Sequence, residues 1–436
     1  MREDDELQVL GAESKQKSRR RWVLGFLGFV ATITIVTGLG LIVRYAIKGA
    51  LDFDEELMRN DGLRPSGNTT IIPALQDAAD SLLNDKLTEI DGLQGQVIVM
   101  EVQTGRILAM VGLERNFEGK FQPCRNFAYQ QELGSVAKTA SLLAALETGE
   151  VALTDTVDTG NGLWAVDNER YMKDHNWPRG GYGMMTFEQA LEVSSNIGIS
   201  KAVMRAFGYD AQAFLDQLAK MSYGQPDSIE GIEGLGKTVY SSPKDSDWVN
   251  RRILWHAIGY ERLMAPIQML TFYNAIANDG KMVKPTLTTK AHPEVINPQI
   301  ASEKNIKLMQ DALDHVVSKG LGRKAGMSLL RVAGKTATSQ VKSYYDHNDE
   351  SVNEYQVGFC GYFPADAPRY SIIVSMNKLG LPASGGGMAG VVFHDIVEWM
   401  LLHGIPQVSV LDDNGKVVSV REYLDQTEKE TNAGTD

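Results

Sequence analysis

The sequence predicts an α/β fold of the α+β type, built on a sheet whose edges come from both ends of the chain. Two observations carry this prediction. Runs rich in β-forming residues lie at residues 95–112 and again at 329–377, whereas the part between them places its apolar residues mostly at helical spacing. The 436 residues suffice for one large or two ordinary domains, and a hydrophobic content of 43% can form a core.

The first element is an uncharged run, WVLGFLGFVATITIVTGLGLIV, at residues 22–43. As a helix it would extend over about 33 Å, which is enough to cross the hydrocarbon core of a bilayer. Basic residues at positions 15, 17, 19, 20 and 21 precede it, so we expect residues 1–21 to be a cytoplasmic tail and the rest of the chain to lie outside. A cleaved signal peptide would be shorter, and a buried soluble helix would have a polar face, so an uncleaved transmembrane helix is the favoured interpretation.

Residues 44–68 are acidic and then rich in turn formers, which predicts a linker. We expect a folded domain over residues 69–405 and a C-terminal tail over residues 406–436. Apolar periodicity, a QTG turn and helix-start signals define the elements of the domain. These are a helix at 69–87, a β-hairpin at 95–112, helices at 135–149, 186–195 and 265–280, β-rich runs at 329–340, 355–363 and 369–377, and a helix at 390–404.

The composition excludes several classes of partner and cofactor. A net charge of −12 argues against nucleic acid, because phosphate binding requires clustered Lys and Arg. The two cysteines are far apart, so we expect Cys360 to be a buried core residue and Cys124 to be a free thiol. The seven histidines show no metal-binding spacing, and the sequence implies neither a metal nor an organic cofactor.

The stretch AGKTATS, at residues 333–339, raises the question of a phosphate-binding loop. Such a loop requires a glycine five residues before Gly334, and Leu329 stands there. The run LLRVAG is apolar except for one arginine, which predicts a buried strand. A cation with two hydroxyl groups on a strand suits a carboxylate ligand better than a nucleotide.

Three short motifs contain groups suited to acyl transfer. GSVAKTAS places Ser135 three residues before Lys138, so that on a helix a neutral lysine amine could reach the serine hydroxyl and take its proton. SSN places Ser194 two residues before Asn196, a hydroxyl and a carboxamide that could relay a proton and hold a substrate amide. KTAT contributes Lys335. Each motif alone is weak evidence.

In this order, and separated by about 60 and about 140 residues, the three motifs resemble those of penicillin-binding proteins and serine β-lactamases. The resemblance covers roughly residues 69–405 and is closest to the class B, monofunctional D,D-transpeptidases. GQVIVMEVQTGRILAMVG resembles the family's first hairpin, EVSSNIGISK its second motif, and VGFCGYFPADAPRYSIIV its late paired strands. The resemblance implies an antiparallel sheet flanked by helices, together with an all-helical subdomain.

The resemblance also implies roles for individual residues. Ser135 would attack the carbonyl between two terminal D-alanines of a peptidoglycan stem peptide, and Lys138 would take its proton. Ser194 and Asn196 would return the proton and align the substrate, while Lys335 would support this network and make the site electropositive.

The third motif would bind the end of the substrate. Thr336 and Thr338 would hold the terminal carboxylate, and the backbone N–H groups of Ser135 and Thr338 would form the oxyanion hole. Ala337 stands where the family has glycine. We expect its methyl group to lie close to the ligand and to affect β-lactam affinity or acceptor choice without inactivating the site.

The implied protein is an inner-membrane D,D-transpeptidase of cell division or elongation, with its catalytic domain in the periplasm. Its expected partners are stem peptides, covalently bound β-lactams such as penicillin, a membrane glycan polymerase, and division or elongation proteins. The linker at residues 44–68 leaves room for only a shortened pedestal region. A carboxypeptidase, a β-lactamase or β-lactam sensor, and a non-catalytic scaffold for wall assembly are the alternatives.

Overall fold

The computed structural model describes residues 69–168, 170–289, 292–345 and 351–405, and the short strands at 409–411 and 417–419. The predicted cytoplasmic tail, transmembrane helix and linker lie outside the described residues, as does most of the C-terminal tail. Within the described ranges, no helix combines the length and the hydropathy that crossing a membrane requires.

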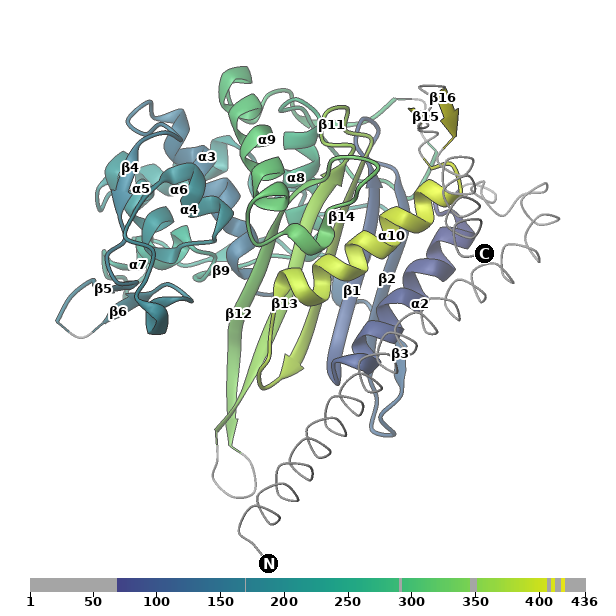
Figure 1. Cartoon of the computed structure of the whole chain (residues 1–436), viewed down its shortest axis with the longest axis horizontal. Coiled ribbons are helices and arrows are strands. Elements are labelled where there is room, and N and C mark those ends of the chain that lie inside the picture. The colour runs from purple at the N-terminus through teal and green to yellow at the C-terminus, as the bar shows by residue number, and fades with distance from the viewer. Residues whose placement is uncertain are drawn as a thin grey trace, which may run out of the picture. The chain divides into compact units, whose positions relative to one another are not determined.

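A six-stranded antiparallel sheet forms the centre of the domain, in the order β12-β13-β14-β1-β2-β3 (Figure 1). Its central pair joins β1 to β14, with Val97 opposite Val374. The sheet therefore takes strands from both ends of the domain, as predicted. Its strands are β1 (Gly92–Glu101), β2 (Ile107–Arg115), β3 (Phe121–Pro123), β12 (Ala333–Tyr345), β13 (Ser351–Phe363) and β14 (Tyr370–Leu379).

Short strands form five additional two-stranded sheets among the described residues. The pairs are β4 (Thr156–Asp158) with β7 (Met184–Thr186), β5 (Leu163–Ala165) with β6 (Tyr171–Lys173), β8 (Val239–Tyr240) with β9 (Arg262–Leu263), β10 (Met282–Val283) with β11 (Val295–Asn297), and β15 (Ser409–Leu411) with β16 (Val417–Ser419).

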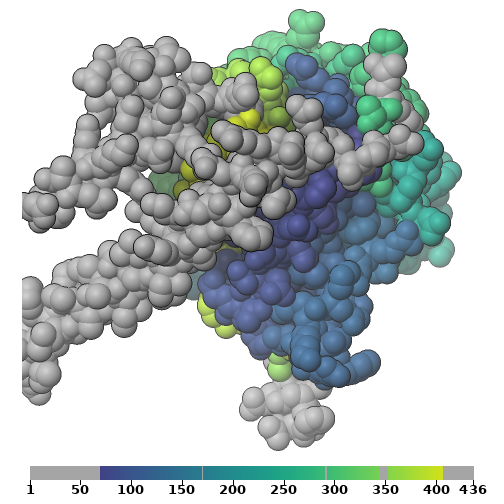
Figure 2. Space-filling view, turned by 90° about the vertical axis from the view of Figure 1, so that its right-hand side faces the viewer, coloured from purple at the N-terminus to yellow at the C-terminus, as the bar shows by residue number. Residues whose placement is uncertain are grey.

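Helices cover both faces of the large sheet. Helices α2 (Pro73–Glu89) and α10 (Gly390–Leu402) lie across one face (Figure 1), and Figure 2 shows α2 in purple beside the blue segment that follows it. Helix α8 (Pro266–Ala277) packs on the other face against β13 and β14. The helices beyond it are α3 (Lys138–Glu147), α4 (Phe187–Glu192), α5 (Asn196–Phe207), α6 (Ala211–Lys220), α7 (Arg252–Ala257) and α9 (Glu303–Ser318).

Strand β1 shows why the sheet separates two hydrophobic clusters. Side chains alternate between the two faces of a strand. Val97 and Val99 accordingly belong to the cluster under α2 and α10, while Ile98 and Met100 belong to the cluster under α8. The predicted burial of Cys360 is confirmed, since this residue lies in the second cluster with 0% exposure.

Local signals position the second predicted motif. Thr186 and Gln189 form the predicted capping box at the start of α4: Thr186 Oγ1 accepts from Gln189 N at 3.1 Å, and Gln189 Oε1 accepts from Thr186 N at 2.9 Å. This satisfies two backbone N–H groups that a helix start would otherwise leave unpaired. The SSN motif follows directly, between α4 and α5.

Two predicted boundaries need correction. The helix expected from residue 135 is a 3₁₀ turn, η2 (Gly134–Ala137), followed by α3 from Lys138. The strand expected from residue 329 begins only at Ala333. Helices α5, α6, α7 and α9 were not predicted individually, although Ser195, Asp210 and Ser302 cap the starts of α5, α6 and α9.

Candidate active site

Ser135 lies in the 3₁₀ turn η2, which leads into α3. In a 3₁₀ helix residues three apart stand above one another, so Lys138 projects on the same side as Ser135. Gly134 has a φ of +61°, and a Cβ atom there would lie 2.8 Å from Ser339 Oγ on β12. A Cβ atom at Gly259 would overlap the carbonyl oxygen of Gly134. The two glycines therefore allow the turn to fit tightly between β12 and the segment that precedes β9.

The Lys138 side chain joins the first motif to the second. Its Nζ donates hydrogen bonds to Ser194 O at 2.6 Å, to Ser194 Oγ at 3.1 Å and to Asn196 Oδ1 at 2.6 Å. The residue is only 1% exposed. None of the hydrogen bonds of Lys138 among the described residues goes to Ser135. A direct bond between the two side chains therefore stays a prediction.

Burial alters the protonation of both predicted lysines. It lowers the pKa of Lys138 to about 7, although the nearby carboxylate of Asp174 opposes the shift. Burial, and then the charge of Lys138, lower the pKa of Lys335 well below its usual range. With a pKa of about 7, Lys138 is neutral in about half of the molecules at neutral pH. A neutral lysine is the form that can accept a proton from a serine hydroxyl.

The backbone around the second motif directs two side chains in different directions. Ser194 has a φ of +56°, in the left-handed region that ends helix α4. Ser195 caps α5, because its Oγ accepts from Gly198 N at 2.9 Å. The sharp change of direction between the two helices lets the Ser194 carbonyl and hydroxyl face Lys138, while Ser195 faces away into the core.

The third motif lies on β12, an edge strand of the sheet. Lys335 is fully buried opposite Cys360, and its Nζ donates to Thr336 O at 3.0 Å and to Thr336 Oγ1 at 3.4 Å. The exposed Thr338 has its Oγ1 bound by Gly385 N at 2.9 Å. Because side chains alternate along a strand, Thr336 and Thr338 share one face.

The methyl group of Ala337 is packed inside the protein. Ala337 is 2% exposed and points to the opposite face of β12 from Thr336 and Thr338. Its Cβ lies 3.6 Å from where a Cβ of Gly358 would stand and 3.9 Å from the equivalent point at Gly134. The methyl group therefore packs between β13 and η2, the turn that bears Ser135, and its closeness to a bound ligand stays a prediction.

Sequence reasoning missed two residues that hold the site in place. Buried Asp174 accepts hydrogen bonds from Ser195 Oγ at 2.8 Å and from Ile197 N at 3.1 Å, which places a carboxylate at the start of α5. Fully buried Tyr273 on α8 donates to Val136 O at 2.8 Å, within η2. Neither residue belongs to a spaced motif. Tyr273 is one of several polar residues on the mostly apolar helix α8, so the sequence did not single it out.

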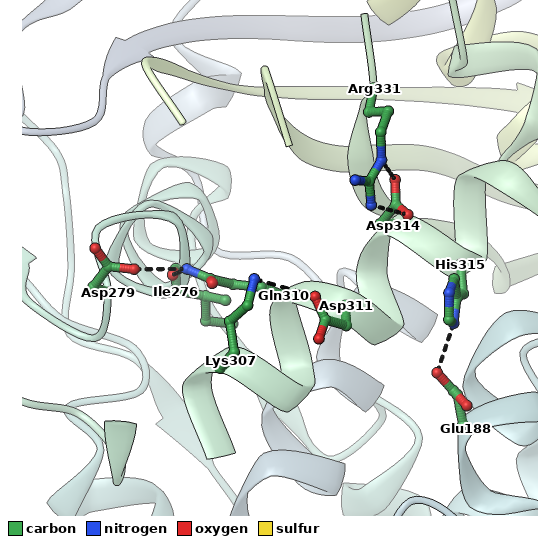
Figure 3. A network of polar contacts seen from close by, with 9 residues as sticks. All are labelled: Glu188, Ile276, Asp279, Lys307, Gln310, Asp311, Asp314, His315 and Arg331. Atoms are coloured by element: carbon green, nitrogen blue, oxygen red, sulfur yellow. Dashed lines mark hydrogen bonds and ion pairs between the residues drawn. The ribbon is translucent and has the colours of Figure 1, made fainter. Parts of the chain in front are cut away.

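Helix α9 contacts α4, which precedes the second motif, and β12, which bears the third. Figure 3 shows polar contacts made by residues of α9. His315 Nδ1 lies 2.7 Å from Glu188 Oε1 on α4. In the same view the adjacent residue, Asp314, accepts two hydrogen bonds from Arg331, at 3.2 and 2.6 Å. Arg331 lies just before β12. Gln310 Nε2 donates to Ile276 O on α8 at 2.9 Å. These contacts set the position of α4 relative to the start of β12.

Two groups of metal-ligating side chains exist among the described residues, although the sequence showed no such spacing. One comprises Glu188, Glu192 and His315, and the other His394, Asp395 and Glu398. Hydrogen bonds already join His315 to Glu188 and His394 to Asp395. Neither group lies among the predicted catalytic residues.

The chain matches the family described as the penicillin binding protein transpeptidase domain over residues 95–398. Penicillin-binding protein PbpB of Mycolicibacterium smegmatis is 27% identical over 350 residues, which cover 71% of this chain and 50% of the relative. Peptidoglycan D,D-transpeptidase FtsI of Escherichia coli is 24% identical over 322 residues, which cover 71% of this chain and 51% of the relative. The chain thus spans about half the length of these curated relatives.

Solved structures agree with this match. The apo transpeptidase domain of penicillin-binding protein 3 from Burkholderia pseudomallei has a TM-score of 0.64 at 25% identity, covering 78% of this chain and 96% of that one. Penicillin-binding protein 3 from Mycobacterium tuberculosis shows the same fold, with a TM-score of 0.64 at 22% identity, covering 78% and 79% of the two chains. The predicted resemblance is confirmed, and the chain belongs to the penicillin-binding protein transpeptidase family.

Proposed function

We propose that this protein is a membrane-anchored peptidoglycan D,D-transpeptidase that works through an acyl-enzyme on Ser135. One observation carries the proposal. The buried Lys138, with its pKa lowered to about 7, is held by Ser194 and Asn196 one turn from the serine. A lysine in this state can act as a base at neutral pH, which an ordinary surface lysine cannot do.

The first half-reaction forms the acyl-enzyme. Neutral Lys138 takes the Ser135 proton, and Ser135 Oγ attacks the carbonyl between the two terminal D-alanines of a stem peptide. The proton passes from Lys138 through Ser194 Oγ, which lies 3.1 Å from Nζ, to the departing D-alanine amine. Buried Lys335 would support this network, and its own pKa is lowered by burial and then by the charge of Lys138.

Strand β12 supplies the substrate-binding side of the site. As an edge strand it has free backbone groups that can pair with an extended peptide. Thr338, and Thr336 on the same face, would bind the terminal carboxylate through their hydroxyl groups. The backbone N–H groups of Ser135 and Thr338 would stabilise the oxyanion.

The second half-reaction joins two stem peptides. An amine of a second stem peptide attacks the acyl carbonyl, and Ser135 Oγ leaves with a proton. Residues 22–43 would anchor the protein in the inner membrane, with residues 1–21 in the cytoplasm and the catalytic domain in the periplasm. A membrane glycan polymerase and proteins of division or elongation are the partners that this placement implies, and β-lactams would acylate the same serine.

The test compares wild type with Ser135→Ala in two assays. Fluorescent penicillin should label the wild type only, and mass spectrometry of muropeptides made from lipid-linked substrate should show cross-links with the wild type only. Equal cross-linking by both proteins would exclude Ser135 as the nucleophile. Release of D-alanine without cross-links would indicate a carboxypeptidase, and turnover of penicillin would indicate a β-lactamase. A wild type inert in both assays would indicate a scaffold.

A further inference from the structure

The segment that begins with Lys173 is attached directly to the second motif. The Lys173 carbonyl accepts a hydrogen bond from Asn196 Nδ2 at 2.7 Å, while the other end of the same carboxamide binds Lys138 at 2.6 Å. The next residue, Asp174, is bound to Ser195 and to the start of α5. The residue that follows, His175, is therefore held beside the candidate active site by two anchored neighbours.

His175 is exposed and pairs with Tyr182. Its Nε2 lies 3.0 Å from the Tyr182 hydroxyl oxygen, and the two rings meet edge to face with centroids 5.7 Å apart. No other hydrogen bond to the ring is found among the described residues. In the tautomer that donates Nε2–H to Tyr182, Nδ1 carries a free lone pair.

The surroundings of His175 lower its pKa below the usual value, although part of the residue is exposed to solvent. Burial against the protein is the largest cause. The charges of Lys138, Arg179 and Lys335 act in the same direction, and the carboxylate of Asp174 opposes them. The imidazole is consequently neutral at pH 7 and able to accept a proton.

The second half-reaction requires the acceptor amine to lose a proton before it reaches the acyl carbonyl. An alkyl amine of the ε-amino type has a pKa of about 10.4, so at neutral pH it arrives as an ammonium ion, which has no lone pair. Lys138 and Lys335 are buried, so an ammonium ion that came close to them would lose its hydration, which is costly for a charged group. The amine should therefore lose its proton at the rim, before it comes close to the lysines.

We propose that His175 is the general base that deprotonates the acceptor ammonium, with Tyr182 orienting its ring. This inference rests on the proposed transpeptidase function. One ammonium proton moves to Nδ1 of His175 and then to solvent. The neutral nitrogen attacks the acyl carbonyl carbon, the bond from that carbon to Ser135 Oγ breaks, and Oγ takes a second proton from the nitrogen through Lys138. The third proton stays on the new amide.

The experiment separates the two half-reactions in the full-length protein. The variants are His175→Gln, Tyr182→Phe and, as a matched control, His292→Gln, which alters an exposed histidine beside the pocket that contains Arg106. We expect His175→Gln to be acylated by fluorescent penicillin within about twofold of the wild-type rate. Its cross-linking rate with an ε-amine acceptor at pH 7 should fall about 10²-fold, a typical contribution of a general base. Tyr182→Phe should show a smaller fall, and His292→Gln none.

Acceptor basicity gives the decisive readout, because a structural defect would not depend on it. With an acceptor α-amine of pKa about 8, which is partly neutral at pH 7, the loss of cross-linking rate in His175→Gln should be smaller. With the ε-amine acceptor, the same loss should become smaller as the pH rises. A defect independent of acceptor pKa and of pH, or an equal loss of acylation, would overturn the proposal. Normal cross-linking by His175→Gln would also overturn it, whereas equal cross-linking by Ser135→Ala would instead overturn the proposed function.

Discussion

Replacing Asp174 by Asn tests whether burial and a single carboxylate together set the protonation of Lys138. The carboxylate opposes the lowering of the Lys138 pKa to about 7, so its neutralisation should lower that pKa further. A fall of one unit, equivalent to about 1.4 kcal/mol, would raise the neutral fraction of the lysine at pH 6 from about 9% to about 50%. The variant also weakens two hydrogen bonds to a charged group, which should reduce the free energy of unfolding by about 1.5–3 kcal/mol.

The assay is the rate of acylation by penicillin between pH 5 and pH 9, normalised to the plateau of each protein. Since the reaction requires neutral Lys138, the rate rises with pH, and the midpoint of the rise should move to lower pH in Asp174→Asn. Asp158→Asn, which changes an exposed carboxylate on β4, is the control and should leave the midpoint in place. A midpoint that is unchanged or higher in a folded Asp174→Asn protein would refute the reasoning.

Three further substitutions examine the turn that bears Ser135. Tyr273→Phe leaves the buried Val136 carbonyl without its donor, so the free energy of unfolding should fall by about 1–3 kcal/mol. Penicillin acylation should also slow. If neither quantity changed, the hydrogen bond would be dispensable. Gly259→Ala should reduce the rate of acylation at least tenfold, because the added methyl group would overlap the start of η2. The control is Gly119→Ala, at a glycine that also has a positive φ but has open space around it, and it should leave the rate unchanged. Ala337→Gly should leave acylation within about twofold and cost about 1 kcal/mol in urea unfolding, and a large gain in acylation would restore the idea of a narrowed cleft.

Local signals in the sequence predicted those elements whose stability depends on neighbours a few residues away. The capping box of Thr186 and Gln189, and the proline at the start of α8, are examples. The 3₁₀ turn at Ser135 could not be predicted in this way. Its geometry depends on how closely Gly134 approaches Ser339 and Gly259, which lie more than a hundred residues further along the chain.

The same limit applies to the candidate site. Ser135, Lys138, Ser194, Asn196 and Lys335 were named from motif order alone. Asp174 and His175 were not, because a single carboxylate or imidazole outside a spaced motif carries no signal until folding brings it to the start of α5. The burial of the Ala337 methyl group was not predicted for a related reason: the burial of a strand residue depends on the elements that cover the sheet.

By itself, the sequence determined the family, the order of the motifs and the kinds of groups that could carry out acyl transfer, since these depend only on residue identity and spacing. Only the tertiary structure decided which of those groups meet and in which protonation state. Lys138 can serve as a base because distant segments exclude water around its amine and place one carboxylate nearby, and solvation and Coulomb energies depend on distances in space rather than along the chain.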